Sequence, residues 1–309
     1  MPNKLSFLIF LGINYLLTSA YSIDSQNIRP EIMAFVDSMS NEECVRLFRP
    51  KKYFDTFQNS VLLDELKILI HHNSPIVRVY SFWALSSKDY NQSFDVLIKN
   101  INNRNILCYP SHDTEISFEG YLYYRIWNKN HKPTENQRNI IDSLIIHNET
   151  AIPLFEALNN FKPDKSHYNR IKELTLSQDY INRYTVIALA KYHCKEDVPI
   201  ILKFIDNEET KSHAFVAIAE FPDISFYNIL KSFLSKEIED RHFYHGRINS
   251  LCEALVQYPT IETVDFLKGI RRKTRFHKRK VFDEALWKAL EKYPNDIFNP
   301  LRSKLEMPY

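Results

Sequence analysis

Glycine is scarce in this chain: four residues among 309, at positions 12, 120, 246 and 269. Ordinary proteins contain about 7% glycine, which serves turns with positive φ and backbone that approaches phosphate closely. Four isolated glycines therefore exclude the glycine-rich phosphate-binding and dinucleotide-binding motifs. The GxSxG and HExxH motifs of hydrolases and zinc proteases are absent as well. The composition favours helices joined by short polar turns, and we predict no cofactor.

The chain also lacks an excess of charge and an apolar run long enough to span a membrane. Lys plus Arg number 40 and Asp plus Glu number 38, so the formal net charge of +2 predicts no general attraction to nucleic acid or membrane. The apolar run 5–17 is shorter than the roughly 20 residues that span a bilayer. We therefore expect no transmembrane segment in the mature chain.

The amino-terminal segment 1–22 has the pattern of a secretory signal peptide. Lys4 precedes the apolar run, and the small residues that follow would place cleavage after residue 20 or residue 22. We expect a secreted or periplasmic protein in which residues 23–309 form a single domain. The alternative is an uncleaved helix that packs on the rest of the chain or tethers it to a membrane.

Cysteine is rare and unclustered. The four cysteines, Cys44, Cys108, Cys194 and Cys252, contain no CxxC pair, which excludes a zinc ribbon. Buried thiols are the favoured interpretation, because cysteine is among the residues most often found inside proteins. In an oxidising compartment up to two disulfides would form instead, and the sequence does not determine their pairing.

A four-residue pattern recurs five times between residues 154 and 293. An apolar or small residue is followed by Ala at +3, by Leu or Ile at +4 and by an aromatic at +7, which are positions on one face of a helix. The alanines lie 31, 29, 37 and 35 residues apart, in the range of helical-hairpin repeats. The copies are Leu154/Ala157/Leu158/Phe161, Thr185/Ala188/Leu189/Tyr192, Ala214/Ala217/Ile218/Phe221, Leu251/Ala254/Leu255/Tyr258 and Leu286/Ala289/Leu290/Tyr293.

Proline ends these helices. It follows Phe221, Tyr258 and Tyr293 directly, and proline disfavours helical backbone in the residue before it. A second apolar segment follows each ending, so each copy predicts a helix, a turn and a second helix. Because neither helix buries its whole apolar face alone, stacking of successive pairs would bury both. The second segments begin near residues 167, 198, 225, 260 and 295.

Residues 73–101 carry the clearest copy, with Pro75 in the first turn of a helix, then Arg78, and Ala84 followed by Leu85 near its end. This stretch resembles a HEAT repeat of the bacterial kind also found in phycobilisome lyases, and residues 182–207 look similar. The resemblance covers roughly residues 60–103 and 150–305. It implies an all-α fold, a right-handed α-solenoid of the armadillo type whose usual work is to hold proteins. Only one other copy has Lys or Arg at the position equivalent to Arg78, six residues before its alanine. We therefore assign no functional residue of the family to this chain.

The aromatic-rich segment 103–137 interrupts the period. Its polarity pattern is compatible with helix or strand, and we favour a helix over residues 113–128. Irregular segments often carry function, and Tyr, Trp and Arg are favoured at interfaces, so we predict a binding surface here. The alternative is packing within an irregular repeat. The predicted binding residues are Tyr121, Tyr124, Arg125 and Trp127.

The run 271–280 holds seven Lys or Arg residues between two predicted helices. Together with Phe276 it could bind a polyanion, because each neutralised phosphate releases counterions. In an exported protein an anionic glycan or lipid head group is the more natural target, and nucleic acid is not expected. A solvated loop is the alternative. The seven cations are Arg271, Arg272, Lys273, Arg275, Lys278, Arg279 and Lys280.

A cluster of Asp240, His242 and His245 resembles a metal site only weakly, because a third placed ligand is missing, and we predict no metal. We expect a non-catalytic module that binds a protein or peptide on a concave face of the repeat array. One alternative is an enzyme on the same scaffold, a lyase or a nucleic-acid glycosylase. Another is a binder of anionic glycan or lipid through the basic run.

Overall fold

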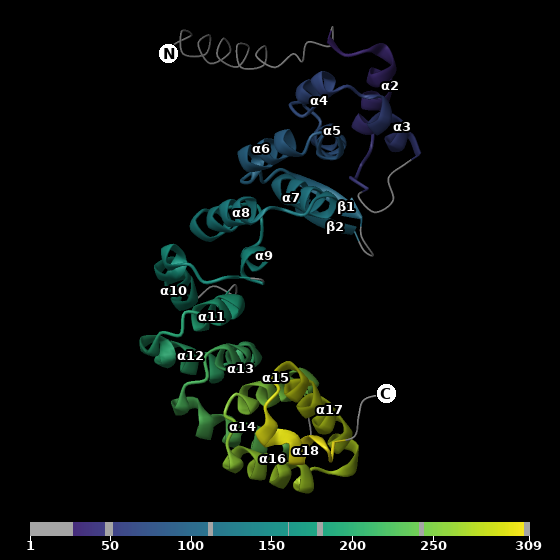
Figure 1. Cartoon of the computed structure of the whole chain (residues 1–309). Coiled ribbons are helices and arrows are strands. Elements are labelled where there is room, and N and C mark those ends of the chain that lie inside the picture. Colours follow the sequence, from purple (N-terminus) through teal and green to yellow (C-terminus); the bar gives the residue numbers. More distant parts are fainter. Residues whose placement is uncertain are drawn as a thin grey trace, which may run out of the picture. The chain divides into compact units, whose positions relative to one another are not determined.

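The computed structural model describes residues 27–46, 52–110, 114–159, 161–177, 182–240 and 244–305. This part of the chain is mostly helical, as the sequence predicts, and contains one two-stranded antiparallel sheet (Figure 1). The chain divides into two compact units, Met1–Pro153 and Leu154–Tyr309. This division does not test the expectation that residues 23–309 form a single domain, which stays a prediction.

The expected signal peptide, residues 1–22, lies outside the described residues. Among the residues that are described, no helix combines the length and the apolar character needed to cross a bilayer.

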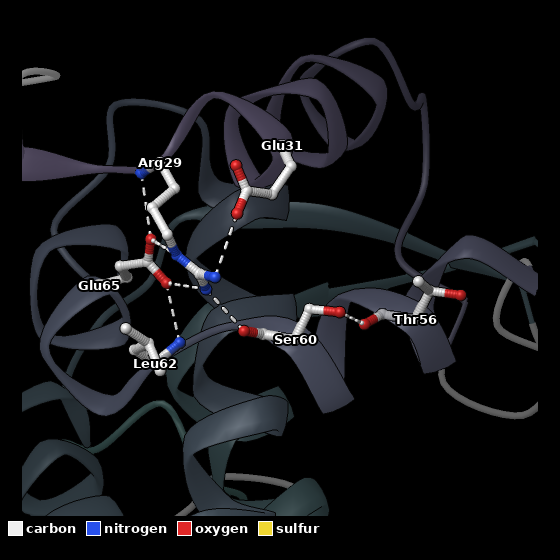
Figure 2. A network of polar contacts seen from close by, with 6 residues as sticks. All are labelled: Arg29, Glu31, Thr56, Ser60, Leu62 and Glu65. Carbon is white, nitrogen blue, oxygen red and sulfur yellow. Dashed lines mark hydrogen bonds and ion pairs between the residues drawn. The ribbon is translucent and has the colours of Figure 1, made fainter.

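The described part of the first unit begins with three helices, α2 (Pro30–Ser40), α3 (Lys52–Ser60) and α4 (Leu63–Leu69). One arginine joins all three (Figure 2). Arg29 donates from Nε and Nη2 to the two carboxylate oxygens of Glu65 at 3.0 and 2.9 Å, and from Nη2 to the carbonyl oxygen of Ser60 at 2.6 Å. Glu65 also accepts from the amide of Leu62 at 2.8 Å. Burial raises the pKa of Glu65, but these hydrogen bonds outweigh burial and lower it below its usual value.

The predicted pair at residues 73–101 is confirmed as α5 (Pro75–Lys88) and α6 (Tyr90–Asn100), with Pro75 at the first helical position. Asp89 ends the first helix and begins the second, because its Oδ1 accepts the amide hydrogen of Gln92 at 2.9 Å. The unit continues with the strands β1 (Ile106–Pro110) and β2 (Thr114–Phe118) and the helices α7 (Glu119–Asn130) and α8 (Glu135–His147).

The helix expected over residues 113–128 is wrong in its first part. Residues 114–118 form β2, which pairs with β1 so that Ile106 lies opposite Phe118, and the helix begins only at Glu119. Gly120 explains why the helix can start there. A side chain at this position would place its Cβ 2.5 Å from the carbonyl oxygen of Asn100, so only glycine lets α7 approach the end of α6.

A disulfide between Cys44 and Cys108 holds the hairpin to the segment after α2. The amide of Val45 donates to the carbonyl oxygen of Cys108 at 3.0 Å, so backbone pairing accompanies the covalent link. The preference for four buried thiols is therefore wrong for this pair. Cys194 is a half-buried thiol and Cys252 a buried one, whose pKa is raised by burial.

The second unit consists of successive helix pairs at the predicted positions. In each pair the first helix carries the first three residues of one copy of the pattern, the aromatic follows within three residues of the helix end, and the second helix coincides with the following apolar segment. The pairs are α9 (Leu154–Leu158) with α10 (Tyr168–Leu176), α11 (Asn182–Ala190) with α12 (Val198–Ile205), α13 (Lys211–Glu220) with α14 (Tyr227–Glu239), α15 (His245–Val256) with α16 (Ile261–Lys273), and α17 (Phe276–Lys292) with α18 (Asn299–Arg302).

Within this unit α11 packs on α13, α13 on α15, and α15 on α17, and the second helices α10, α12, α14 and α16 each pack on a first helix. The alanines of the pattern are all buried, as the prediction requires: Ala157, Ala188, Ala217, Ala254 and Ala289. The small alanine side chain lets neighbouring helices approach closely there.

The helix endings contain a regularity that sequence analysis missed. The residue after the proline accepts a backbone amide of the next helical turn: Asp223 from Ser225 at 3.0 Å and Asn295 from Ile297 at 3.2 Å. The terminal aromatic also reaches back to the preceding pair, since the hydroxyl of Tyr258 donates to the carbonyl oxygen of Asp223 at 2.7 Å. Such an ending stops one helix and starts the next, and at Tyr258 it also links adjacent pairs.

Candidate functional site

The seven cations of the run 271–280 do not form one patch. Arg271 donates from Nε and Nη2 to the carboxylate of the buried Asp283 at 2.9 and 2.7 Å. Lys278 is buried and donates to the carbonyl oxygens of Ile238, at 3.1 Å, and Asp240, at the end of α14. Arg279 is half-buried and donates to the carbonyl oxygen of Thr274 at 3.1 Å. These three cations serve the fold, so the predicted polyanion-binding set is too large.

The other four cations are exposed and lie within four residues of an exposed aromatic residue, Phe276. We define the cationic turn as Arg272 and Lys273 at the end of α16, Arg275 and Phe276 at the start of α17, and Lys280 one turn further on. The side chain of Phe276 is 86% exposed, the highest value among the exposed large hydrophobic residues.

An additional helical turn places this ring in solvent. The helix α17 begins thirteen residues before its pattern alanine, Ala289, whereas α15 begins nine residues before Ala254 and α13 six before Ala217. The first buried apolar side chain of α17 is Phe282, so the extension that carries Phe276 adds no apolar core contact.

The four predicted binding residues on α7 differ in burial, because they lie on different sides of the helix. Trp127 is fully buried, with its ring stacked on Tyr90 at 5.6 Å between centroids, so the prediction that it lines a binding surface is not supported by its position. Tyr121, Tyr124 and Arg125 are half-buried and lie on a more exposed side of the helix than Trp127. The tyrosine rings stack at 6.3 Å, and the Arg125 guanidinium lies 5.8 Å from the Tyr121 ring centroid. We call these three residues the α7 platform.

A buried ion pair fixes the start of α7. Arg78 donates from Nε and Nη2 to Oε1 and Oε2 of Glu119 at 2.7 and 2.6 Å. Glu119 also accepts from the Tyr123 hydroxyl at 2.8 Å and from the Asn105 amide at 3.0 Å. Burial raises the pKa of Glu119, but the hydrogen bonds from Arg78 and Asn105 outweigh burial, and the pKa is lowered. Nothing in the sequence near Arg78 indicates a partner 41 residues away.

Two stretches of the second unit, DKSHYNRIK at 164–172 and DISFYNILK at 223–231, share Asp, Ser, Tyr, Asn and Lys at the same positions. This longer identity was also missed by sequence analysis. The two stretches are the turns and first helical residues of α10 and α14, so they occupy the same place in alternate helix pairs.

The shared lysines bridge each stretch to the next helix pair. Lys172 forms an ion pair with Asp197 at 2.6 Å, and the hydroxyl of Tyr168 donates to the same carboxylate at 3.0 Å. Lys231 forms the corresponding ion pair with Glu262 at 2.6 Å. Hydrogen bonds to Asp197 and Tyr168 raise the pKa of Lys172 to about 12, so this lysine is charged at neutral pH and is not a general base. We assign these contacts to packing between pairs.

The predicted absence of a metal site stays a prediction. His242 lies outside the described residues, and across the ranges that the structure describes no three His, Cys, Asp or Glu side chains gather in a way that could hold a metal ion.

Comparison of the chain with family models, with curated proteins and with solved structures finds no match. The resemblance to HEAT repeats stays a prediction.

Proposed function

We propose that this chain is a HEAT-like α-solenoid that binds a protein or peptide and catalyses no reaction. The observation that carries this proposal is the packing of α11, α13, α15 and α17 in succession through the buried alanines of the pattern. Arrays built in this way present extended surfaces on which other proteins bind.

The α7 platform is the proposed contact surface within the first unit. Tyr and Arg are the residues that most often dominate binding energy at protein interfaces. The stacked rings of Tyr121 and Tyr124 offer an apolar face, and the Arg125 guanidinium lies against the Tyr121 ring. A peptide with an apolar side chain would complement this face. The buried pair of Arg78 and Glu119 holds the helix beneath them in place before binding.

Export is part of this proposal. The disulfide of Cys44 and Cys108 is of a kind that persists in oxidising compartments and is rare in the cytosol. Amino-terminal sequencing of the protein recovered from its native source is expected to begin at residue 21 or residue 23.

Site-specific crosslinking on the full chain tests the proposed contact. A photo-reactive amino acid at position 124 should capture a defined protein, whereas the same group at the exposed Lys203 should not. With the captured protein purified, replacing Tyr121, Tyr124 and Arg125 by alanine should weaken its binding about a hundredfold, because two or three such residues each contribute more than about 1 kcal/mol.

An unchanged affinity in that triple variant would remove the α7 platform from the proposal. Turnover of a small substrate by the purified chain, with no protein captured at position 124, would favour the enzymatic alternative instead.

A further inference from the structure

We propose that the cationic turn binds the surface of an anionic phospholipid bilayer. The proposal rests on the exposed cations and the exposed ring of the cationic turn, and it is independent of the peptide contact assigned to α7.

The ring of Phe276 has no packing role. It is 86% exposed, and it lies on the additional turn that makes α17 begin further from its pattern alanine than α13 or α15 does. Keeping a phenyl ring in water is unfavourable, because apolar surface is stabilised by leaving water. A ring in this exposed position is available for burial in an apolar environment outside the protein, such as a lipid bilayer.

Helix stability explains only some of the charges of the turn. Arg272 and Lys273 lie in the last turn of α16, where cations favour the helix dipole. Arg275 is the N-cap residue of α17, whose first turn contains no acidic residue, and there a cation opposes the dipole. Departures of this kind from local preference are expected at functional positions.

The acidic groups near the turn are already engaged. Asp283 accepts three hydrogen bonds from Arg271, and Glu284, which also interacts electrostatically with Lys280, forms an ion pair with Lys288 at 2.6 Å. The exposed charge of the turn is therefore positive. A phosphate-bearing surface is its electrostatic complement.

A bilayer fits these groups better than a polyanionic chain. Proteins that bind single-stranded nucleic acid stack successive bases on several aromatic rings along a groove, whereas the cationic turn offers one ring. A single apolar side chain surrounded by Lys and Arg is the pattern of a peripheral membrane contact, in which the cations meet anionic head groups and the ring enters the boundary beneath them. The expected binding is weak, reversible and sensitive to salt.

Sedimentation with vesicles tests this inference on the full chain. The vesicles contain 30% phosphatidylglycerol in phosphatidylcholine, or phosphatidylcholine alone, each at about 0.1 M and 0.5 M salt, where screening differs strongly. We expect binding only to the anionic vesicles at low salt. Replacing Phe276 by alanine should lower partitioning about tenfold, because one exposed apolar ring is removed from the contact.

Charge reversal with a matched control separates the turn from net charge. The double variant Arg272→Glu with Lys273→Glu should lower partitioning at least about 25-fold, from about fivefold per lost cation. The double variant Lys99→Glu with Lys203→Glu makes the same change in net charge at exposed helical positions elsewhere and should bind nearly as wild type.

The inference is overturned if the chain ignores anionic vesicles, if the two double variants lose binding equally, or if Phe276→Ala binds as wild type. Tight binding to heparin or single-stranded DNA without vesicle binding would likewise overturn it and would assign the turn to a polyanionic chain.

Discussion

Replacing Ala254 by leucine tests whether the helices of the second unit meet through their alanines. Ala254 is fully buried on α15, and this helix packs against α13 and also against α17. Leucine adds three carbon atoms at a point where the neighbouring helices are close. The helix propensities of the two residues are both high, so the substitution acts on packing and hardly on helix formation.

The expected magnitude follows from two opposing effects. If the interface had space, burying three more carbons would stabilise the fold by about 0.8 kcal/mol each. In a filled interface the neighbouring helices must move apart, and such overpacking costs about 1 to 3 kcal/mol net. Because α15 has neighbours on both sides, we expect a loss of about 2 kcal/mol, which is roughly a thirtyfold change in an opening equilibrium.

Hydrogen exchange followed by mass spectrometry measures this loss where it occurs. Amides of residues 245–292 should lose about thirtyfold in protection in Ala254→Leu. Ala34→Leu is the matched control, because Ala34 is an exposed alanine of helix α2 and tolerates a larger side chain. Equal protection in the two variants, within about twofold, would refute the claim that these alanines set the helix spacing.

Two further perturbations give distinct outcomes. Burial raises the pKa of Asp142 on α8 from 3.8 to about 6, so stability falls as pH rises through this window, and Asp142→Asn should stabilise the chain at pH 7 but not at pH 4. Allowing for its partial exposure, we expect about 1 kcal/mol by urea denaturation, and an equal effect at both pH values would contradict the assignment. Tyr258→Phe removes the hydrogen bond to the Asp223 carbonyl and should cost about 1 kcal/mol, whereas Tyr244→Phe, at an exposed tyrosine, should cost less than about 0.3 kcal/mol.

Features encoded within a few residues were predictable from the sequence. Leu286, Ala289 and Leu290 lie on one face of α17 and are buried, so the pattern predicted both the helix and its buried side, and Tyr293 directly follows the helix. Proline then marked the helix end because its effect on the preceding residue is local. The second unit was foreseen element by element for this reason.

Features that depend on contacts distant in the sequence were not predictable. The hairpin at 106–118 is stabilised from outside by the disulfide to Cys44, which lies 64 residues before Cys108. Its own polarity pattern is compatible with helix or strand, and the helix favoured over residues 113–128 was wrong in its first part for this reason. The pair of Arg78 and Glu119 is similar, because nothing near either residue identifies the other.

The basic run 271–280 is a different case. Which of its cations are buried could have been predicted from helix periodicity, but a count of its charges does not show it. Extending the buried face of α17 back from Ala289 through Leu286 and Phe282 at helical spacing reaches Lys278, which is buried, whereas Phe276 and Lys280 fall on the other side. A cation on the buried face must find acceptors, and Lys278 finds them in the carbonyl groups at the end of α14. The position of a cation around the helix axis therefore distinguishes cations that stabilise the fold from cations that are available to a ligand. Net charge does not make this distinction. This is why the membrane test reverses Arg272 and Lys273 and leaves Lys278 untouched.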